Sequence, residues 1–256
     1  LEHRRQRQMC IRDSDYPLFQ NSEISNYESF VLRNSGNDWT STMLRDGYIT
    51  SLANKTDIDH QLFRPAVIYL NGEYWGIQNI REKVNEHFLS SHHDINPENI
   101  DLLDIQGTNP ENIVHGTNVD YLNLLDYLNN NDIRDPVIQS GIEGWIDINS
   151  FMQYQAFQIF IDNRDWPGNN IKFWRDHRTT GKWRWILYDT DFGFGIWDPG
   201  AYTFNTLSFA LTPNGPDWPN PPWSTLLLRT LMENDHFQKM QLCKQDNLDL
   251  LTARPM

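Results

Sequence analysis

Short apolar runs bounded by turn residues occupy the first third of the chain, and this pattern is typical of β-strands. Strands are predicted at residues 30–32, 66–70 and 74–80. The last two flank Asn71-Gly72, a pair that favours a two-residue hairpin turn because both of its residues adopt positive φ. The sequence therefore predicts a β-hairpin in this region.

Apolar residues at helical spacing predict four helices, at residues 40–53, 119–128, 150–161 and 224–232. The first helix is expected to be capped by Thr40 or Ser41 and to bury Met43, Leu44, Tyr48 and Leu52. The third is densely apolar, which predicts a buried helix, and Asp147 or Asn149 is expected to cap it.

A second hairpin is predicted from strands at residues 171–175 and 182–188, which flank Thr179-Thr180-Gly181. Residues 97–116 are polar and are expected to be irregular, and the Pro-rich residues 213–222 predict a long loop. The overall pattern is a sheet-bearing part up to about residue 88, followed by a mostly helical part. It predicts an α+β fold.

Composition narrows the possible functions of this 256-residue chain. A hydrophobic content of 39% predicts a folded protein, and a net charge of −13 with no basic face argues against nucleic-acid binding. No apolar run is long enough for a membrane span. Cys10 and Cys243 lack neighbouring ligands, so neither a zinc site nor a disulfide framework is expected.

The two ends of the chain differ from the remainder. Residues 1–14 are basic and polar, and their segment MCIRDS resembles a translated sequencing adapter, so we interpret them as non-native. The native start and any targeting signal are then expected to be missing. The carboxyl end stops without a closing motif, which we interpret as a truncation.

Residues 162–195 gather the side chains best suited to phosphoryl transfer. Asn170 follows Asp165 by five positions, as in the Asp-x-x-x-x-Asn spacing of protein-kinase catalytic loops. Asp189 and Asp191 are two residues apart, so an extended backbone directs both carboxylates to one side. Such oxygen ligands suit Mg²⁺.

A structural interpretation of the same residues has to be weighed against this chemical one. Asp and Asn also gather at helix ends and turns, where they bond the backbone. On spacing alone the structural interpretation is favoured, and Asp162 and Asn163 are expected to be a structural pair. Asp191-Phe192-Gly193 spells the kinase metal-binding triplet, but three residues recur by chance.

Five segments together resemble the spore coat protein H (CotH) kinase family over most of residues 30–232: Arg33-Asn34, MLRDGY, VIYLNGEYWGIQNIREKVNEHFL, IDNRDWPGNNIKFW and KWRWILYDTDFGFG. The resemblance implies a single domain with a two-lobed, atypical protein-kinase-like fold. Its small, sheet-bearing N-lobe would lie at residues 15–88, and its larger, mainly helical C-lobe with a β-hairpin at residues 89–256. It also implies ATP and Mg²⁺ (or Mn²⁺) as cofactors, Ser and Thr hydroxyls of a protein substrate as acceptors, and an extracellular or cell-surface location.

The family motifs assign roles to individual residues. Asp165 corresponds to the catalytic carboxylate, and Asn170 to the amide that follows it, with Asn169 as the alternative. Asp189 corresponds to the principal Mg²⁺ ligand, and Asp191 is a second ligand. The literal Asp-Phe-Gly triplet would instead favour Asp191; we favour the family match because it covers more positions.

The same motifs place the nucleotide in the N-lobe. Arg33 would replace the lysine that usually binds phosphate, braced by Asp46 on the following helix. Residues 80–83 would pass beside adenine, with backbone groups of Ile80 and Arg81 at the purine edge and Glu82 as a further contact. No glycine-rich strand pair precedes residue 30, so the N-lobe is expected to be incomplete and ATP binding weak.

Two other functions remain open at this stage. One is a non-catalytic secreted, adhesion or coat protein on the same fold, which would bind partners without Asp165 and Asp189. The other is a metal-dependent phosphohydrolase that uses the paired aspartates, which accounts least well for the first hairpin.

Overall fold

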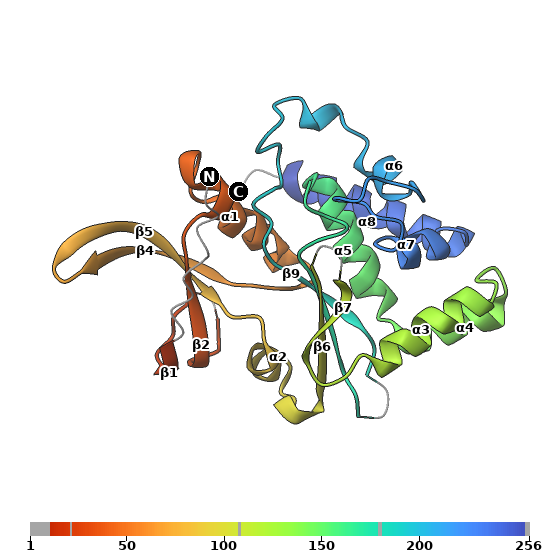
Figure 1. Cartoon of the computed structure of the whole chain (residues 1–256), viewed down its shortest axis with the longest axis horizontal. Helices are drawn as coiled ribbons and strands as arrows, with labels where there is room; N and C mark the ends of the chain where they lie inside the picture. The colour runs from red at the N-terminus through yellow and green to blue at the C-terminus, as the bar shows by residue number, and fades with distance from the viewer. Residues whose placement is uncertain (1–10, 21, 107–108, 179–180, 254–256) are drawn as a thin grey trace.

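The computed structural model describes residues 11–20, 22–106, 109–178 and 181–253. This part of the chain contains two sheets and eight α-helices, which confirms the predicted α+β class. Figure 1 shows how these elements are arranged. The strands are β1 (Ile11–Asp15), β2 (Asn26–Arg33), β3 (Asp59–His60), β4 (Phe63–Leu70), β5 (Glu73–Glu82), β6 (Ile100–Gln106), β7 (Asn109–His115), β8 (Ile171–Asp176) and β9 (Arg184–Leu187). The helices are α1 (Arg45–Leu52), α2 (Glu86–His93), α3 (Val119–Asn130), α4 (Pro136–Trp145), α5 (Ile148–Phe160), α6 (Thr206–Ala210), α7 (Leu226–Leu231) and α8 (Asp235–Ala253).

The first sheet is antiparallel, with strand order β1-β2-β5-β4. The predicted β4–β5 hairpin is confirmed, and Asn71 and Gly72 have φ of 52° and 84° at its turn. β1 pairs antiparallel with β2, with Ile11 opposite Phe30 and Asp15 opposite Asn26.

The second sheet has strand order β3-β9-β8-β6-β7. The predicted hairpin of β8 and β9 is confirmed, although Thr179 and Thr180 lie outside the described residues. The prediction that residues 97–116 are irregular is wrong, because β6 and β7 lie there. β6 is stabilised on both faces: Leu102 belongs to one apolar cluster and Leu103 to another.

The main core lies between the second sheet and the helices that follow it. α5 packs against β9 and α8, and Phe151 meets Trp185 with 4.5 Å between ring centroids. Asp147 caps α5 by accepting a hydrogen bond from the Ser150 backbone N–H at 3.0 Å. α5 ends at the loop that carries Asp165, so core packing fixes the start of that loop.

Helix α1 is shorter than predicted and buries a different face. Asp38, not Thr40 or Ser41, accepts a hydrogen bond from the backbone N–H of Arg45, the first residue of the helix, and another from the backbone N–H of Thr42, which precedes the helix. Leu44 and Tyr48 were expected inside but are exposed. The residues that α1 buries are Asp46, Gly47, Ile49 and Thr50. The apolar spacing misleads because an ion pair, described below, turns Asp46 inward.

The other three predicted helices agree in position with helices of the structure, whereas α2, α4, α6 and α8 were not predicted. The predicted segments 119–128, 150–161 and 224–232 correspond to α3, α5 and α7. Residues 213–222 form no helix or strand, as predicted. Among the described residues, no helix is both long and apolar enough to cross a membrane.

Candidate active site

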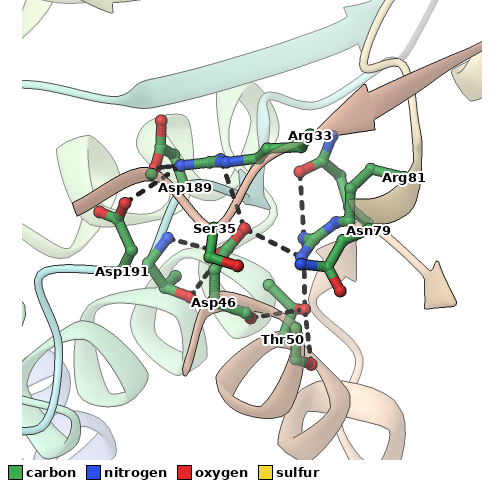
Figure 2. Close-up of polar contacts among 12 residues, drawn as sticks. Arg33, Ser35, Asp46, Thr50, Asn79, Arg81, Asp189 and Asp191 are labelled. Atoms are coloured by element: carbon green, nitrogen blue, oxygen red, sulfur yellow. Dashed lines mark hydrogen bonds and ion pairs between the residues drawn. The ribbon is translucent and has the colours of Figure 1, made fainter. Parts of the chain in front are cut away.

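Arg33, the last residue of β2, lies among three carboxylates that come from two other parts of the chain (Figure 2). Its Nη1 is 3.3 Å from Asp46 Oδ2 on α1. Its Nη2 contacts Asp189 Oδ1 and lies 3.3 Å from Asp191 Oδ2, both in the loop after β9. The expected brace by Asp46 is therefore present, and Asp189 and Asp191 converge on one nitrogen atom.

Asp46 joins this cluster to the loop after β9. Its Oδ2 is 2.9 Å from Arg81 Nη1, while its Oδ1 accepts hydrogen bonds from the backbone N–H of Thr190 at 2.9 Å and from the Thr190 hydroxyl at 3.0 Å. Burial raises the pKa of Asp46, but the charges of Arg81 and Arg33 outweigh burial and lower it overall. Asp46 is thus held in its ionised form. It connects β2 and β5 to Thr190, the residue between Asp189 and Asp191.

Arg81 contacts Asp46 and is only 1% exposed. Its Nη2 donates to Thr50 Oγ1 at 3.3 Å and to Gln61 Oε1 at 3.2 Å, and its other terminal nitrogen pairs with Asp46. A guanidinium buried this deeply requires such partners. Arg81 therefore acts as a buried counter-charge for Asp46.

Asp191 is held by the loop that follows β2. The backbone N–H of Asn37 donates to its Oδ2 at 2.9 Å. Gly36 has φ of +58°, and a Cβ there would lie 2.2 Å from the same oxygen, so the close approach requires glycine. Burial and repulsion from Asp189 raise the pKa of Asp191 to about 7, despite the opposing charge of Arg33.

Asp165 and its amide partners form a second group beside the first. Asn169 Nδ2 donates to both carboxylate oxygens of Asp165, at 3.0 and 2.9 Å, and Asn170 Nδ2 donates to Oδ2. The indole N–H of Trp218 donates to Oδ1 at 3.1 Å. Burial raises the pKa of Asp165 and repulsion from Asp189 adds to this, so the two groups interact electrostatically.

Two site residues have left-handed backbones, with φ of 53° at Asn170 and 51° at Asp189. Asn and Asp tolerate this conformation better than other non-glycine residues, and unusual backbone angles gather at functional sites. The conformation of Asp189 breaks the extended geometry from which we expected Asp189 and Asp191 to share a side. They do converge, but the contacts with Arg33 bring them together.

Asp162 and Asn163 have the structural role predicted for them. Asp162 accepts from Arg164 Nε at 2.7 Å and from the Thr206 hydroxyl at 2.6 Å. Asn163 donates to Gln158 Oε1 at 2.9 Å and accepts from the backbone N–H of Asp165. These contacts fix the turn between α5 and the Asp165 group.

Ile80 and Glu82 lie outside both groups. At these residues β5 runs between β2 and β4, so its backbone N–H and C=O groups face neighbouring strands. The Glu82 carboxylate accepts from the backbone N–H of Leu62 at 2.9 Å and contacts His92 Nε2 at 2.8 Å. The expected purine contacts of Ile80, Arg81 and Glu82 do not agree with this arrangement, because those groups are engaged within the protein.

Sequence reasoning did not identify Thr190, Trp218, Thr50 and Asn37 as part of the site. Trp218 is 53 positions from Asp165 and lies in a Pro-rich loop, so no local pattern marks it. Thr190 had a usable signal, since it separates the two predicted metal ligands.

The donor set of the site suits a hard cation. Asp189 and Asp191 offer carboxylate oxygens and Asn170 offers an amide oxygen, all types that Mg²⁺ accepts. Among the described residues, no group of three or more His, Cys, Asp or Glu side chains is arranged to hold a metal ion. A Mg²⁺ ion bound here would therefore have at most two carboxylate ligands, as is usual for Mg²⁺ bound together with phosphate.

The site brings a sheet arginine together with a helix carboxylate and two loop carboxylates, beside a further carboxylate held by amides. The chain belongs to the CotH kinase protein family, whose sequence model matches residues 9–242. Membership of this kinase family implies a protein substrate. A search of curated proteins finds no match.

Proposed function

We propose that the chain catalyses ATP- and Mg²⁺-dependent phosphoryl transfer to Ser or Thr hydroxyls of a protein substrate, on a two-lobed kinase-like fold. The observation that carries this proposal is the convergence of Asp189 and Asp191 on Arg33, next to the amide-bound Asp165. Phosphoryl transfer depends on positioning and charge stabilisation, which such an arrangement provides.

The charges of the first group favour a bound cation. The carboxylates of Asp46, Asp189 and Asp191 face two guanidinium groups, those of Arg33 and Arg81. The group therefore carries an excess of one negative charge when all members are ionised, and Asp165 lies close enough to add to it. Mg²⁺, when bound, would neutralise this excess and the charge of the nucleotide phosphates.

Each proposed role follows from the position of the residue. Asp189, Asp191 and Asn170 would hold the metal ion, and the Arg33 guanidinium would bind phosphate oxygens. Asp165 would orient the acceptor hydroxyl and accept its proton on a carboxylate oxygen. The donors from Asn169, Asn170 and Trp218 fix this carboxylate in one orientation.

An extracellular or cell-surface location is proposed on the family resemblance alone.

The test is transfer of labelled phosphate from ATP to Ser- and Thr-containing proteins, with Mg²⁺ or Mn²⁺ present. Asp189→Asn should lower transfer at least about 100-fold, because it removes a charge that acts on the metal and the phosphates. Asp126→Asn on α3, an exposed carboxylate far from the site in sequence, is the matched control and should leave transfer unchanged. Equal transfer by wild type and Asp189→Asn would refute the proposal. A partner-binding protein that shows no ATP-dependent shift in melting temperature would favour the non-catalytic alternative.

A further inference from the structure

The β4–β5 hairpin extends beyond the rest of the first sheet as an arm (Figure 1). β2 pairs with β5 only from Asn79 to Glu82, so no third strand supports the part of the hairpin beyond Asn79 in the described chain. We call residues 66–78 the hairpin arm. A two-stranded ribbon of this kind is marginally stable in water without further cover.

The hairpin arm exposes an unusual amount of apolar surface. Val67 and Ile77 are opposite each other in the strand register, and Tyr69 and Tyr74 form the next pair on that face, with 6.0 Å between ring centroids. Tyr69 is 65% exposed and Tyr74 62%. Trp75, at the register shift, is also exposed. Contiguous apolar surface of this kind on a soluble protein marks an interaction site.

The arm also has a free strand edge. The outer edge of β4 pairs with no other strand among the residues that the structure describes. Proteins usually protect such edges with charges, prolines or bulges. Arg64 and Pro65 lie at the base of β4, but residues 66–70 contain neither a charge nor a proline. The β5 edge is less suitable for pairing because Trp75 and Gly76, with φ of +116° at Gly76, interrupt its register.

We propose that the hairpin arm is a dimerisation surface on which β4 pairs antiparallel with β4 of a second copy of this chain. Antiparallel pairing of identical edges satisfies two-fold symmetry, which is the commonest symmetry of homo-oligomers. The two amino-terminal sheets then become continuous, and the Val67–Tyr69 faces of both copies adjoin. This interface does not depend on the proposed phosphoryl transfer.

The charge distribution favours a second copy at the arm over contact through the body. Each chain has a net charge of −13, so two bodies repel one another, whereas residues 66–78 contain one charged side chain, Glu73. Pairing along residues 66–70 involves far fewer residues than the roughly 20–30 a side of a standard interface, which buries about 800 Å² per partner. The dimer is therefore weak, with a dissociation constant of roughly 10–100 μM.

Sedimentation equilibrium tests the proposed dimer. The protein concentration should run from about 1 to 300 μM, a range that brackets the expected dissociation constant. The wild type should change from monomer to dimer, and Val67→Lys should remain monomeric because pairing would bring a charged side chain from each copy against the apolar face of the other. Val137→Lys on α4 is the matched control, because Val137 is also exposed, at 74%. This variant should dimerise as the wild type does.

Hydrogen exchange at low and high concentration gives a second readout that needs no substitution. Amides of residues 66–70 should gain protection as concentration rises, while those of α3 should not. A wild type that stays monomeric at the highest concentration overturns the proposal. The proposal is also overturned if Val67→Lys does not weaken the dimer, or if dimer formation leaves hydrogen exchange in β4 unchanged.

Discussion

Replacing Asp46 by Asn should destabilise the fold more than any surface substitution, because Asp46 balances two buried arginines. Asp46 is 7% exposed, and its Oδ2 lies 2.9 Å from Arg81 and 3.3 Å from Arg33. Removing one partner from a buried ion pair typically costs about 3–5 kcal/mol. Asn keeps the shape of the side chain and can still accept from Thr190, so we expect about 3 kcal/mol.

Urea unfolding followed by circular dichroism measures this change in the free energy of unfolding. For a chain of this size about 3 kcal/mol corresponds to a fall in Tm of roughly 6–12 °C. Asp126→Asn is the control, and its effect should stay within about 0.5 kcal/mol. The double variant Asp46→Asn, Arg81→Met should lose less stability than the sum of the losses of the two single variants, because it removes both charges of the Asp46–Arg81 pair together.

The same substitution has a defined pH dependence. The folded-state pKa of Asp46 lies below its unfolded value of about 3.9, so its contribution is fully present above that value and is lost as pH falls through the folded pKa. The difference in stability between wild type and Asp46→Asn should therefore shrink below about pH 4. A loss under about 0.5 kcal/mol at pH 7, or a difference that grows on acidification, would refute the role assigned to Asp46.

Three further substitutions test separate parts of the structure. Gly36→Ala should cost about 1–3 kcal/mol in thermal unfolding, because a positive φ is strained and the new Cβ meets Asp191; a neutral Ala would contradict the tight approach. Trp218→Phe should leave the fold intact by circular dichroism but lower kcat, because one donor to Asp165 is lost; an unchanged kcat would show that this donor is dispensable. Leu103→Ala in β6 should cost about 2–5 kcal/mol in urea unfolding, since Leu103 is fully buried; a cost below about 1 kcal/mol would mean that the site collapses around the smaller side chain.

The parts of the fold that local signals describe were predictable. Asn71-Gly72 specifies a turn through its own backbone preferences, and Asp147 caps α5 with a contact three residues away. By contrast, β6 and β7 were missed because they lie in a segment rich in Asn, Asp and Pro, where the apolar residues do not alternate regularly with polar ones. Leu102 and Leu103 face opposite sides of a buried strand, and only the neighbouring strands reveal that burial.

The site divides in the same way. Asp165, Asn170, Asp189 and Asp191 could be chosen from their spacing and the family motifs, and Arg33 with its brace from the resemblance. The central position of Asp46 could not, because its partners come from β2, β5 and the loop after β9. That side chain also explains why the helical pattern of α1 failed: an inward carboxylate replaces the expected apolar face.

The short strand β3 has a consequence for how the molecule unfolds. It belongs to the first 88 residues, yet it pairs in parallel with β9 of the second sheet. Asp59 within it accepts from the Trp174 indole at 2.9 Å and from Arg184 Nε at 3.2 Å. The two halves of the chain are thus joined by backbone hydrogen bonds as well as by the covalent link. A cut near residue 88 should accordingly leave neither half able to fold alone, and chemical denaturation should proceed in a single cooperative transition.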